Sequence, residues 1–214
     1  MMPVLITYIR TQDKGQELRY ALRSLNNITN FNGDVWVVGD REKWFGDIVY
    51  IRDYRLESRP YLDQARKIYS ALQYMPEKFI ISMDDVYVTE PVEIGVYTLG
   101  ELKDDVSSFH KRTKKMTKDK LLELGLPIKD YETHAPMLVE RYKLKETLEF
   151  ILESKKSLQW RSMYGNMHRI EAEPFEDKKT RDSHLKTGPI LSTIFYTSEL
   201  HDLFPEPSLY EVKE

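Results

Sequence analysis

The sequence has no cysteine among its 214 residues, which excludes a disulfide scaffold and a cysteine-ligated zinc site. Its nine glycines form no GxGxxG, P-loop or GxSxG signature, and no HExxH pair is present. No apolar run approaches the roughly 20 residues of a membrane span, and the N-terminus lacks a secretory pattern. We therefore expect a soluble, cytoplasmic protein in which side chains and a metal, rather than a glycine-built cradle, would hold a nucleotide.

The composition indicates a globular chain with one substantial core. Hydrophobic residues make up 41% and aromatic residues 12%, so disorder is excluded. A formal net charge of −3 gives no sign of nucleic-acid binding. There is no internal repeat and no linker-like segment, and we predict a single domain over residues 1–214. The composition does not indicate an oligomeric state.

The first 90 residues alternate between strand-like and helix-like patterns. Short apolar runs predict four strands, at Val4–Ile9, Val35–Val38, Ile48–Ile51 and Phe79–Met83. Between them, one helix follows a capping box of Asp13 and Gln16, and another follows Arg59-Pro60 and ends before Pro76. The order β-α-β-β-α-β favours an α/β fold, with a mostly parallel, doubly wound sheet flanked by helices.

The second half is more irregular and more helical. The basic run Lys111–Lys120 is typical of a solvated loop, with a basic flap over an anionic substrate as the alternative. We expect a short helix from Thr117 to Gly125, a longer one containing Leu144 and Leu148, and partly helical structure over 158–168. Residues 171–183 are expected to form a loop. A late strand over 189–196 and a frayed acidic C-terminus complete the prediction.

Polar side chains follow several of the predicted strands. In doubly wound sheets the ligand binds at the carboxyl ends of the strands, where Tyr8, Arg10, Asp40, Asp84 and Asp85 would converge. Adjacent carboxylates after a central strand repel each other, and a divalent cation relieves this repulsion. Oxygen ligands suit Mg²⁺ or Mn²⁺, so we predict that Asp84 and Asp85 bind such a metal. The alternative is that the two acids only mark a solvated strand end.

Four blocks of the sequence resemble the Stealth family of sugar-phosphotransferases, which includes capsule-polymer enzymes and a GlcNAc-1-phosphotransferase. The blocks are Thr7–Ile9, Glu17–Leu25 (ELRYALRSL) with Val35–Asp40 (VWVVGD), Phe79–Val88, and Thr133–Met137 (THAPM). They occur in the family's order, and ELRYALRSL is the most specific of them. The resemblance implies a GT-A-like (Rossmann-like) domain that binds a nucleotide-sugar.

The resemblance also implies a division of labour along the chain. Residues 1–100 would bind the nucleotide-sugar and residues 101–214 would bind a carbohydrate or glycopolymer acceptor and complete the catalytic site. His134 would deprotonate the acceptor hydroxyl, with Asp85 and Arg161 as further catalytic residues. Donor binding is assigned to six residues: Tyr8, Arg10, Arg19, Asp40, Arg66 and Lys67.

Three functions remain open from the sequence. The first is transfer of a sugar-1-phosphate to an acceptor hydroxyl with release of a nucleoside monophosphate. The second is a GT-A glycosyltransferase that moves the sugar alone and releases the diphosphate. The third is a sugar- or nucleotide-binding protein without turnover, which is favoured by Met83 and Arg10, where the sequence departs from the family pattern.

Overall fold

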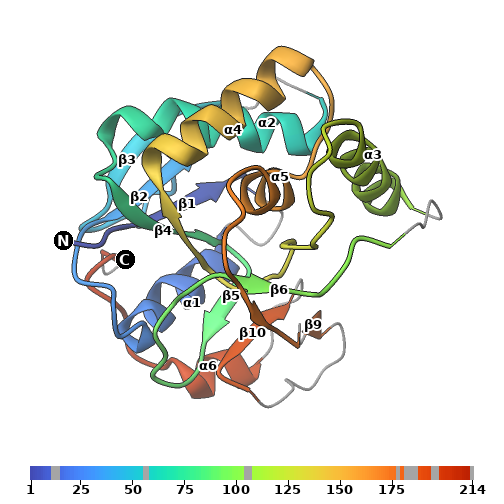
Figure 1. Cartoon of the computed structure of the whole chain (residues 1–214). Coiled ribbons are helices and arrows are strands. Elements are labelled where there is room, and N and C mark those ends of the chain that lie inside the picture. Colours follow the sequence, from blue (N-terminus) through green and yellow to red (C-terminus); the bar gives the residue numbers. More distant parts are fainter. Residues whose placement is uncertain are drawn as a thin grey trace.

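The computed structural model describes residues 1–10, 15–54, 58–103, 108–176, 179–180, 188–193 and 198–212. A twisted sheet crosses the middle of the molecule, with helices on both of its faces (Figure 1). In chain order, the elements are β1 (Val4–Tyr8), α1 (Gln16–Ser24), η1 (Leu25–Asn27), β2 (Val35–Gly39), β3 (Val49–Arg52), α2 (Pro60–Ala71), η2 (Leu72–Tyr74), β4 (Lys78–Met83), β5 (Val86–Val88), β6 (Tyr97–Thr98), α3 (Phe109–Glu123), β7 (Met137–Glu140), α4 (Arg141–Ser154), α5 (Trp160–Met167), β8 (Glu173–Pro174), β9 (Lys179–Thr180), β10 (Ile190–Thr193) and α6 (Ser198–Leu203).

The central sheet has the strand order β3-β2-β1-β4-β7. The first four strands are parallel, and β7 is antiparallel to β4. Thr7 pairs with both Val38 and Met83, so the carboxyl ends of three parallel strands lie at one edge. The predicted α/β fold with a mostly parallel sheet is confirmed, as is the predicted order of the first six elements. Strand β7 was missed, because its four residues carry too short a pattern to separate from the irregular segment before it.

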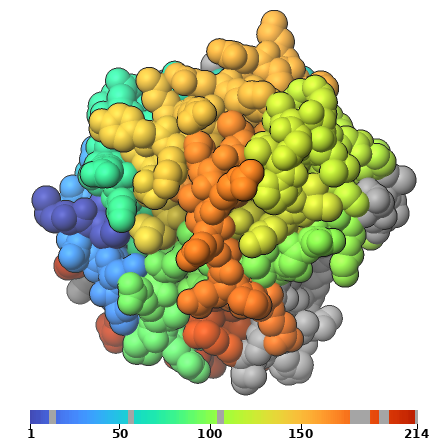
Figure 2. Space-filling model, in the orientation of Figure 1, coloured from blue at the N-terminus to red at the C-terminus, as the bar shows by residue number. Residues whose placement is uncertain are grey.

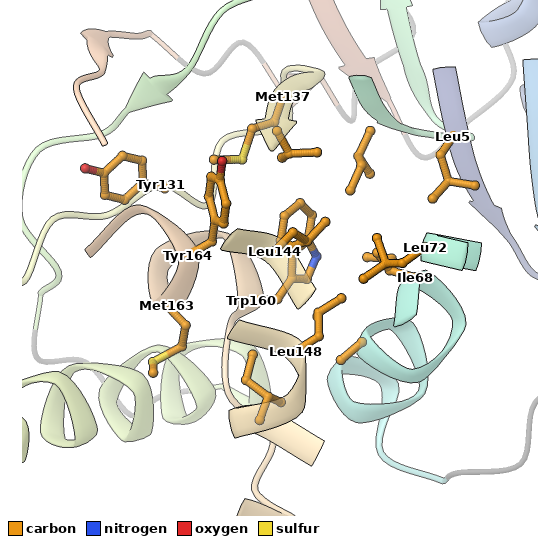
Figure 3. Close-up of a cluster of buried hydrophobic side chains, with 14 of the residues drawn as sticks. Leu5, Ile68, Leu72, Tyr131, Met137, Leu144, Leu148, Trp160, Met163 and Tyr164 are labelled. Atoms are coloured by element: carbon orange, nitrogen blue, oxygen red, sulfur yellow. The ribbon is translucent and has the colours of Figure 1, made fainter. Parts of the chain in front are cut away.

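The inner strands β1, β2 and β4 are buried on both faces of the sheet, which explains why they show no alternation, whereas β3 is more exposed and β7 alternates. Along β1, Leu5 packs into one hydrophobic cluster, whereas Val4 and Ile6 pack into another on the opposite face. Helices α2, α4 and α5 supply the first cluster, and α1 supplies the second. Figure 3 shows part of the first cluster, which extends from Leu5 of β1 across side chains of these helices and of η2: Ile68, Leu72, Leu144, Leu148, Trp160, Met163 and Tyr164.

The chain leaves the central sheet at the end of β4, where the two acids lie, and continues as β5 in a second sheet. Asp84 and Asp85 form a turn, and β5 then pairs antiparallel with β10 from near the end of the chain. Helix α1 packs against β5 and α6, with Tyr20, Tyr87 and Leu200 in a third buried cluster. The acid pair therefore lies at the junction between two sheets, where the chain changes direction.

The basic run Lys111–Lys120 is helical, so the prediction of a loop there was wrong. Helix α3 begins after Ser108, whose side chain accepts a hydrogen bond from the backbone N–H of Lys111 at 3.2 Å. The buried face of α3 consists of Thr113, Thr117 and Leu121. Two of these three residues are polar, and their hydroxyls bond to carbonyls four residues earlier. An apolar-periodicity rule cannot recognise such a face.

Residues 198–212 of the C-terminal segment are described and pack against the rest of the protein, so the prediction of a frayed tail was wrong there. Residues 198–203 form α6, and Glu211 is held by two arginines of α1. The late strand is confirmed over Ile190–Thr193, whereas residues 194–197 lie outside the described residues.

Asp13 lies outside the described residues, but α1 begins at Gln16 after a glycine with no side-chain cap, so the predicted capping box was wrong. Part of the expected loop over 171–183 also lies outside them; within its described part, Glu173–Pro174 and Lys179–Thr180 form short strands, so the loop prediction was wrong there.

Gly165 offers a direct test of the packing between α5 and the segment before β7. A Cβ at this position would lie 2.4 Å from the Tyr131 ring, whereas a Cβ at Gly95 would meet nothing within 4 Å. We expect Gly165→Ala to lower the free energy of unfolding by about 1–3 kcal/mol, as overpacked cores do. Chemical denaturation would measure this change, with Gly95→Ala as the matched control. Equal stability of the two variants would contradict the packing described.

Candidate functional site

A pocket of about 310 Å³ opens at the carboxyl ends of β1 and β4. We call it the acidic pocket. It is lined by residues from the end of β1, the first turns of α2 and the end of β4: Thr7, Ile9, Pro60, Tyr61, Asp63, Gln64, Lys67, Met83 and Asp84. Because β1 and β4 are parallel neighbours, both deliver their last residues to the same place. The pocket thus lies where the sequence predicts a ligand.

Asp84 and Asp85 are partly exposed at this edge, in the turn between β4 and β5. Within the described residues, no group of three or more histidines and acids is gathered to hold a metal ion. Two adjacent carboxylates nevertheless fit a Mg²⁺-type ion, which commonly takes one or two carboxylates and completes its shell with water and substrate phosphates. Asp84 and Asp85 would hold such an ion.

A network of charged side chains runs along α2 into the floor of the acidic pocket. The ammonium of Lys67 lies 2.8 Å from Asp63, and both side chains are almost fully buried, at 2% and 1% exposure. Arg66 bridges Asp63 and Asp53, at 3.2 and 2.6 Å. The sequence assigned Arg66 and Lys67 to donor binding. The structure places Lys67 on the pocket lining and Arg66 behind it, where it holds Asp63 in position.

A second pocket, of about 340 Å³, lies at the same edge of the sheet; Arg10 lines it, whereas the preceding residue, Ile9, lines the acidic pocket. We call it the arginine pocket. Its lining comes from the ends of β1, β2 and β3: Arg10, Asp40, Arg41, Tyr50, Arg52 and Tyr54. Arg41 and Arg52 each lie over a tyrosine ring, at 5.6 and 4.6 Å from the centroids of Tyr50 and Tyr54. These planar, cationic and aromatic groups suit a nucleotide.

The predicted donor-binding residues Arg10 and Asp40 both line the arginine pocket, and they are joined directly. The backbone N–H of Arg10 donates to Asp40 at 2.8 Å, and its guanidinium pairs with Glu42 at 2.6 Å. This pairing raises the pKa of Arg10 above its ordinary value. Tyr8 is only 1% exposed and donates from its hydroxyl to Glu42 at 2.9 Å. Tyr8 is therefore buried behind the pocket lining and acts through Glu42, the partner of Arg10.

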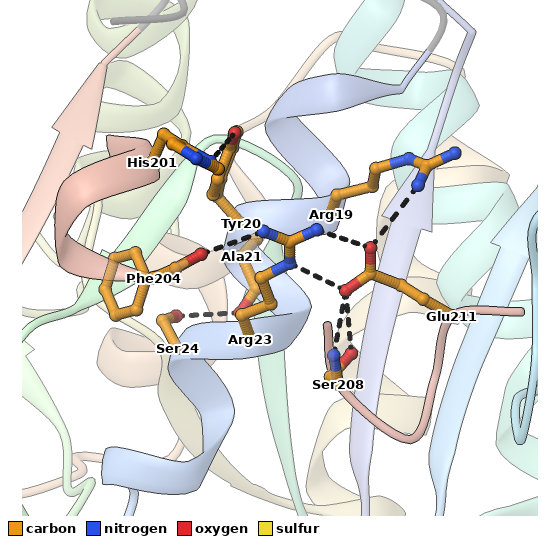
Figure 4. Close-up of polar contacts among 9 residues, drawn as sticks. All are labelled: Arg19, Tyr20, Ala21, Arg23, Ser24, His201, Phe204, Ser208 and Glu211. Carbon is orange, nitrogen blue, oxygen red and sulfur yellow. Dashed lines mark hydrogen bonds and ion pairs between the residues drawn. The ribbon is translucent and has the colours of Figure 1, made fainter. Parts of the chain in front are cut away.

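Arg19, also assigned to donor binding, lies away from the linings of both pockets. Its guanidinium is 3.5 Å from Glu211 and lies 4.5 Å from the centroid of the Trp44 ring. Figure 4 shows Arg19 and Arg23 reaching from α1 to the same carboxylate. The printed contacts of Arg19 thus tie the C-terminal segment to α1.

His134 and Arg161 belong to one local unit in front of β7. His134 lies in the segment before that strand and is partly exposed. The guanidinium of Arg161, which is 3% exposed, donates to the backbone carbonyls of Thr133 and Ala135, at 3.0 and 2.6 Å. These two bonds fix the backbone on either side of His134. Arg161 therefore sets the position of the predicted base.

Tyr61 and Glu132 are candidate site residues that the sequence did not indicate. Burial, together with the negative charge of Glu132, raises the pKa of Tyr61 to about 12, although the nearby Gln159 acts in the opposite direction. Tyr61 lines the acidic pocket and contacts His110 through its hydroxyl. Because its phenol stays protonated at neutral pH, Tyr61 can donate a hydrogen bond to a ligand.

Glu132 lies two residues before His134 and accepts a hydrogen bond from the backbone N–H of Ser162 at 3.1 Å. Burial raises the pKa of Glu132, while the positive charge of Arg161 opposes this rise. A carboxyl group whose pKa is moved towards neutrality is suited to acid–base work. No sequence signal separates Glu132 from the many other glutamates, because the long-range contact with α5 creates its environment.

No family model matches the sequence, and no curated protein matches it. Among solved structures, an active-site mutant of LgtC superposes with a TM-score of 0.55 at 9% identity, covering 94% of this chain and 95% of that chain. This likeness shows the fold: a mixed α/β structure with a mostly parallel sheet, as in GT-A glycosyltransferases. The Stealth resemblance is not shown by these comparisons.

Two further structures are more distant. The 4-diphosphocytidyl-2C-methyl-D-erythritol synthase of Anaerococcus prevotii gives a TM-score of 0.44 at 11% identity, covering 82% of this chain and 86% of that one. Apo-form glycosyltransferase GlyE of Streptococcus pneumoniae gives 0.42 at 10% identity, covering 84% of this chain and 46% of that one. At these scores neither adds to the argument.

None of the helices among the described residues is long and apolar enough to cross a membrane.

Proposed function

We propose that the protein is a nucleotide-sugar-dependent transferase that moves a sugar-1-phosphate to an acceptor hydroxyl. The observation that carries the proposal is the presence of two pockets at the same strand ends, one acidic and one arginine-lined. A nucleotide-sugar has two dissimilar ends joined by a pyrophosphate. The arginine pocket suits the nucleotide, and the acidic pocket, with its buried Asp63–Lys67 pair, suits the polar sugar.

A divalent cation held by Asp84 and Asp85 would supply charge neutralisation for the pyrophosphate. The chain's own residues then have three tasks. Lys67 and Arg10 bring positive charge to either side of the donor, His134 accepts the proton of the acceptor hydroxyl on an imidazole nitrogen, and Arg161 holds His134 in place. The acceptor oxygen bonds to the phosphorus next to the sugar, and the bond to the leaving nucleoside monophosphate breaks.

Transfer of the sugar alone is the second candidate, because the fold is shared with GT-A glycosyltransferases. In that reaction the acceptor attacks the sugar carbon and a nucleoside diphosphate leaves. A panel of nucleotide-sugars, with Mg²⁺ or Mn²⁺ and simple sugar acceptors, would distinguish the two by the product. Monophosphate release supports sugar-1-phosphate transfer, and diphosphate release supports sugar transfer. Donor binding without release of either supports a binding protein and contradicts both.

His134→Ala is expected to lower kcat by about a hundredfold or more, because general-base catalysis typically contributes at least that factor. The variant should bind the donor with unchanged affinity, since the base acts on the acceptor. Steady-state kinetics of product release would measure the change. His201→Ala is the matched control, because His201 is an exposed residue of α6, outside the segment before β7 that contains His134. Equal kcat values for the two variants would remove His134 from the mechanism.

A further inference from the structure

A third hollow, of about 400 Å³, lies at the opposite edge of the central sheet. We call it the distal pocket. It is formed by the end of α2 and the start of α4: Tyr69, Ser70, Leu72, Gln73, Arg141, Tyr142 and Lys145. Figure 2 shows these two helices side by side at the surface, α2 in teal and α4 in yellow to orange. The backbone N–H of Arg141 donates to the carbonyl of Glu77, just before β4, so this pocket lies at the amino end of that strand.

The lining of the distal pocket carries two cations and no acid, although the whole chain has a net charge of −3. Among the residues that the structure describes, no carboxylate forms an ion pair with Arg141, whose guanidinium instead contacts the neighbouring Tyr142. The Nε of Arg141 is buried and makes no hydrogen bond to any described residue. The lining therefore offers two positive charges, one of them on a guanidinium that no carboxylate pairs among the described residues, and such a hollow is suited to an anionic group.

Lys145 is the second available cation. It lies 3.7 Å from Glu149, and both side chains are about half exposed, at 53% and 43%. An exposed pair of this kind is weak and exchanges readily. The hydroxyl of Tyr69 also donates to Glu149, at 2.9 Å, and so holds that carboxylate at the rim. Lys145 can therefore turn towards a ligand while Glu149 keeps another partner.

The other lining residues indicate which class of molecule would carry the anionic group into the pocket. Tyr69 and Tyr142 present flat rings with polar tips, and Tyr142 is 66% exposed. Gln73 adds an amide oxygen that can accept from a hydroxyl group of a ligand, whereas the hydroxyl of Ser70 already bonds to Asp53 and to a backbone carbonyl of α2. We propose that the distal pocket binds an acidic saccharide, a sugar ring that bears a phosphate or carboxylate, outside the transfer site. The choice of a saccharide over other anions rests on the proposed function, whereas the anion site does not.

The test is calorimetric titration of the full chain with three probes: glucose 6-phosphate, glucose and inorganic phosphate. We expect glucose 6-phosphate to bind in the millimolar range or tighter, at least about tenfold more tightly than either of the others, because only it meets both the cations and the tyrosines. Equal affinity for inorganic phosphate would overturn the saccharide assignment. Absence of glucose 6-phosphate binding would overturn the site altogether.

Variants then locate the binding. Arg141→Gln and Lys145→Gln should each weaken glucose 6-phosphate binding about tenfold or more. Lys156→Gln should not, because it removes the same charge as Lys145→Gln from an exposed position beyond the end of α4. Lys145 is exposed, so its variant remains informative if Arg141→Gln unfolds. Loss of binding in Lys67→Gln instead would place the probe in the acidic pocket and overturn the proposal. A negative result in the product assay would leave this outcome unaffected.

Discussion

Replacement of Asp84 or Asp85 with asparagine is expected to lower metal-dependent turnover at least about a hundredfold, because each change removes one of the two adjacent carboxylates in the turn after β4, where Asp84 lines the acidic pocket. Metal assistance is worth several kcal/mol in such reactions, and each 1.4 kcal/mol is a factor of ten. Asparagine keeps the size of the side chain, so the effect reports the charge. The measurement is kcat as a function of Mn²⁺ concentration, with a rightward shift of the metal response in both variants.

A matched control is available at the other end of the sheet. Asp34 is exposed and directly precedes β2, and its contact with β1 uses its backbone carbonyl only. Asp34→Asn should leave both kcat and the metal response unchanged. Nucleotide binding with Mn²⁺ and with a chelator gives a second readout that does not require the acceptor to be known. If Asp84→Asn and Asp85→Asn bound nucleotide and responded to metal as the wild type does, the acid pair would have no role in the site.

Glu211→Ala is expected to destabilise the fold by about 3 kcal/mol, because it leaves two guanidinium groups without their shared carboxylate. The side chain of Glu211 is only 2% exposed, and Arg23 donates to both of its oxygens at 2.8 Å (Figure 4). Chemical denaturation would measure the loss. Glu206→Ala, an exposed glutamate in the same segment, is the control. Equal stability of the two variants would mean that the C-terminal contact contributes nothing.

The same contact makes stability depend on pH in a known direction. Burial acts to raise the pKa of Glu211, but hydrogen bonds from Arg23 and Ser208 outweigh it and hold the pKa below its ordinary value. The unfolded chain therefore binds a proton more readily than the folded one. This contribution is present above the ordinary carboxyl pKa of about 4.3 and is lost as the pH falls through the lower folded value. Glu211→Gln should flatten that part of the acid-unfolding curve.

The sequence predicts the inner strands of the central sheet well, because β1, β2 and β4 are continuous apolar runs of the kind found in strands buried on both faces. Val4–Tyr8 and Lys78–Met83 are of this kind, and α2 presents an apolar stripe on one face. The second half of α3 was predicted as the helix from Thr117, but its first half was missed because threonines form most of its buried face. The spacing of apolar residues along the sequence predicts a helix or strand only where the buried residues of that element are themselves apolar.

The residues of the candidate site also fall into a predictable and an unpredictable group. Asp84, Arg10 and Asp40 were predictable, since each follows an identifiable strand and parallel strands end together. Glu132 and Tyr61 were not, because their raised pKa values arise from segments that meet only in the folded chain. The pairing of Glu211 with α1 joins positions nearly the whole chain apart, and no local rule anticipates it.

The pairing of β5 with β10 has a consequence for how the protein is made. During synthesis the chain leaves the ribosome from its N-terminus, so β5 emerges about a hundred residues before its partner strand, which ends at Thr193. Until then, the edge of β5 and the apolar face of α1 beneath it lack their final cover. Such long-range closure slows folding. We expect nascent chains that stop short of β10 to be the species on which chaperones act, even though every residue of the acidic pocket has already been translated.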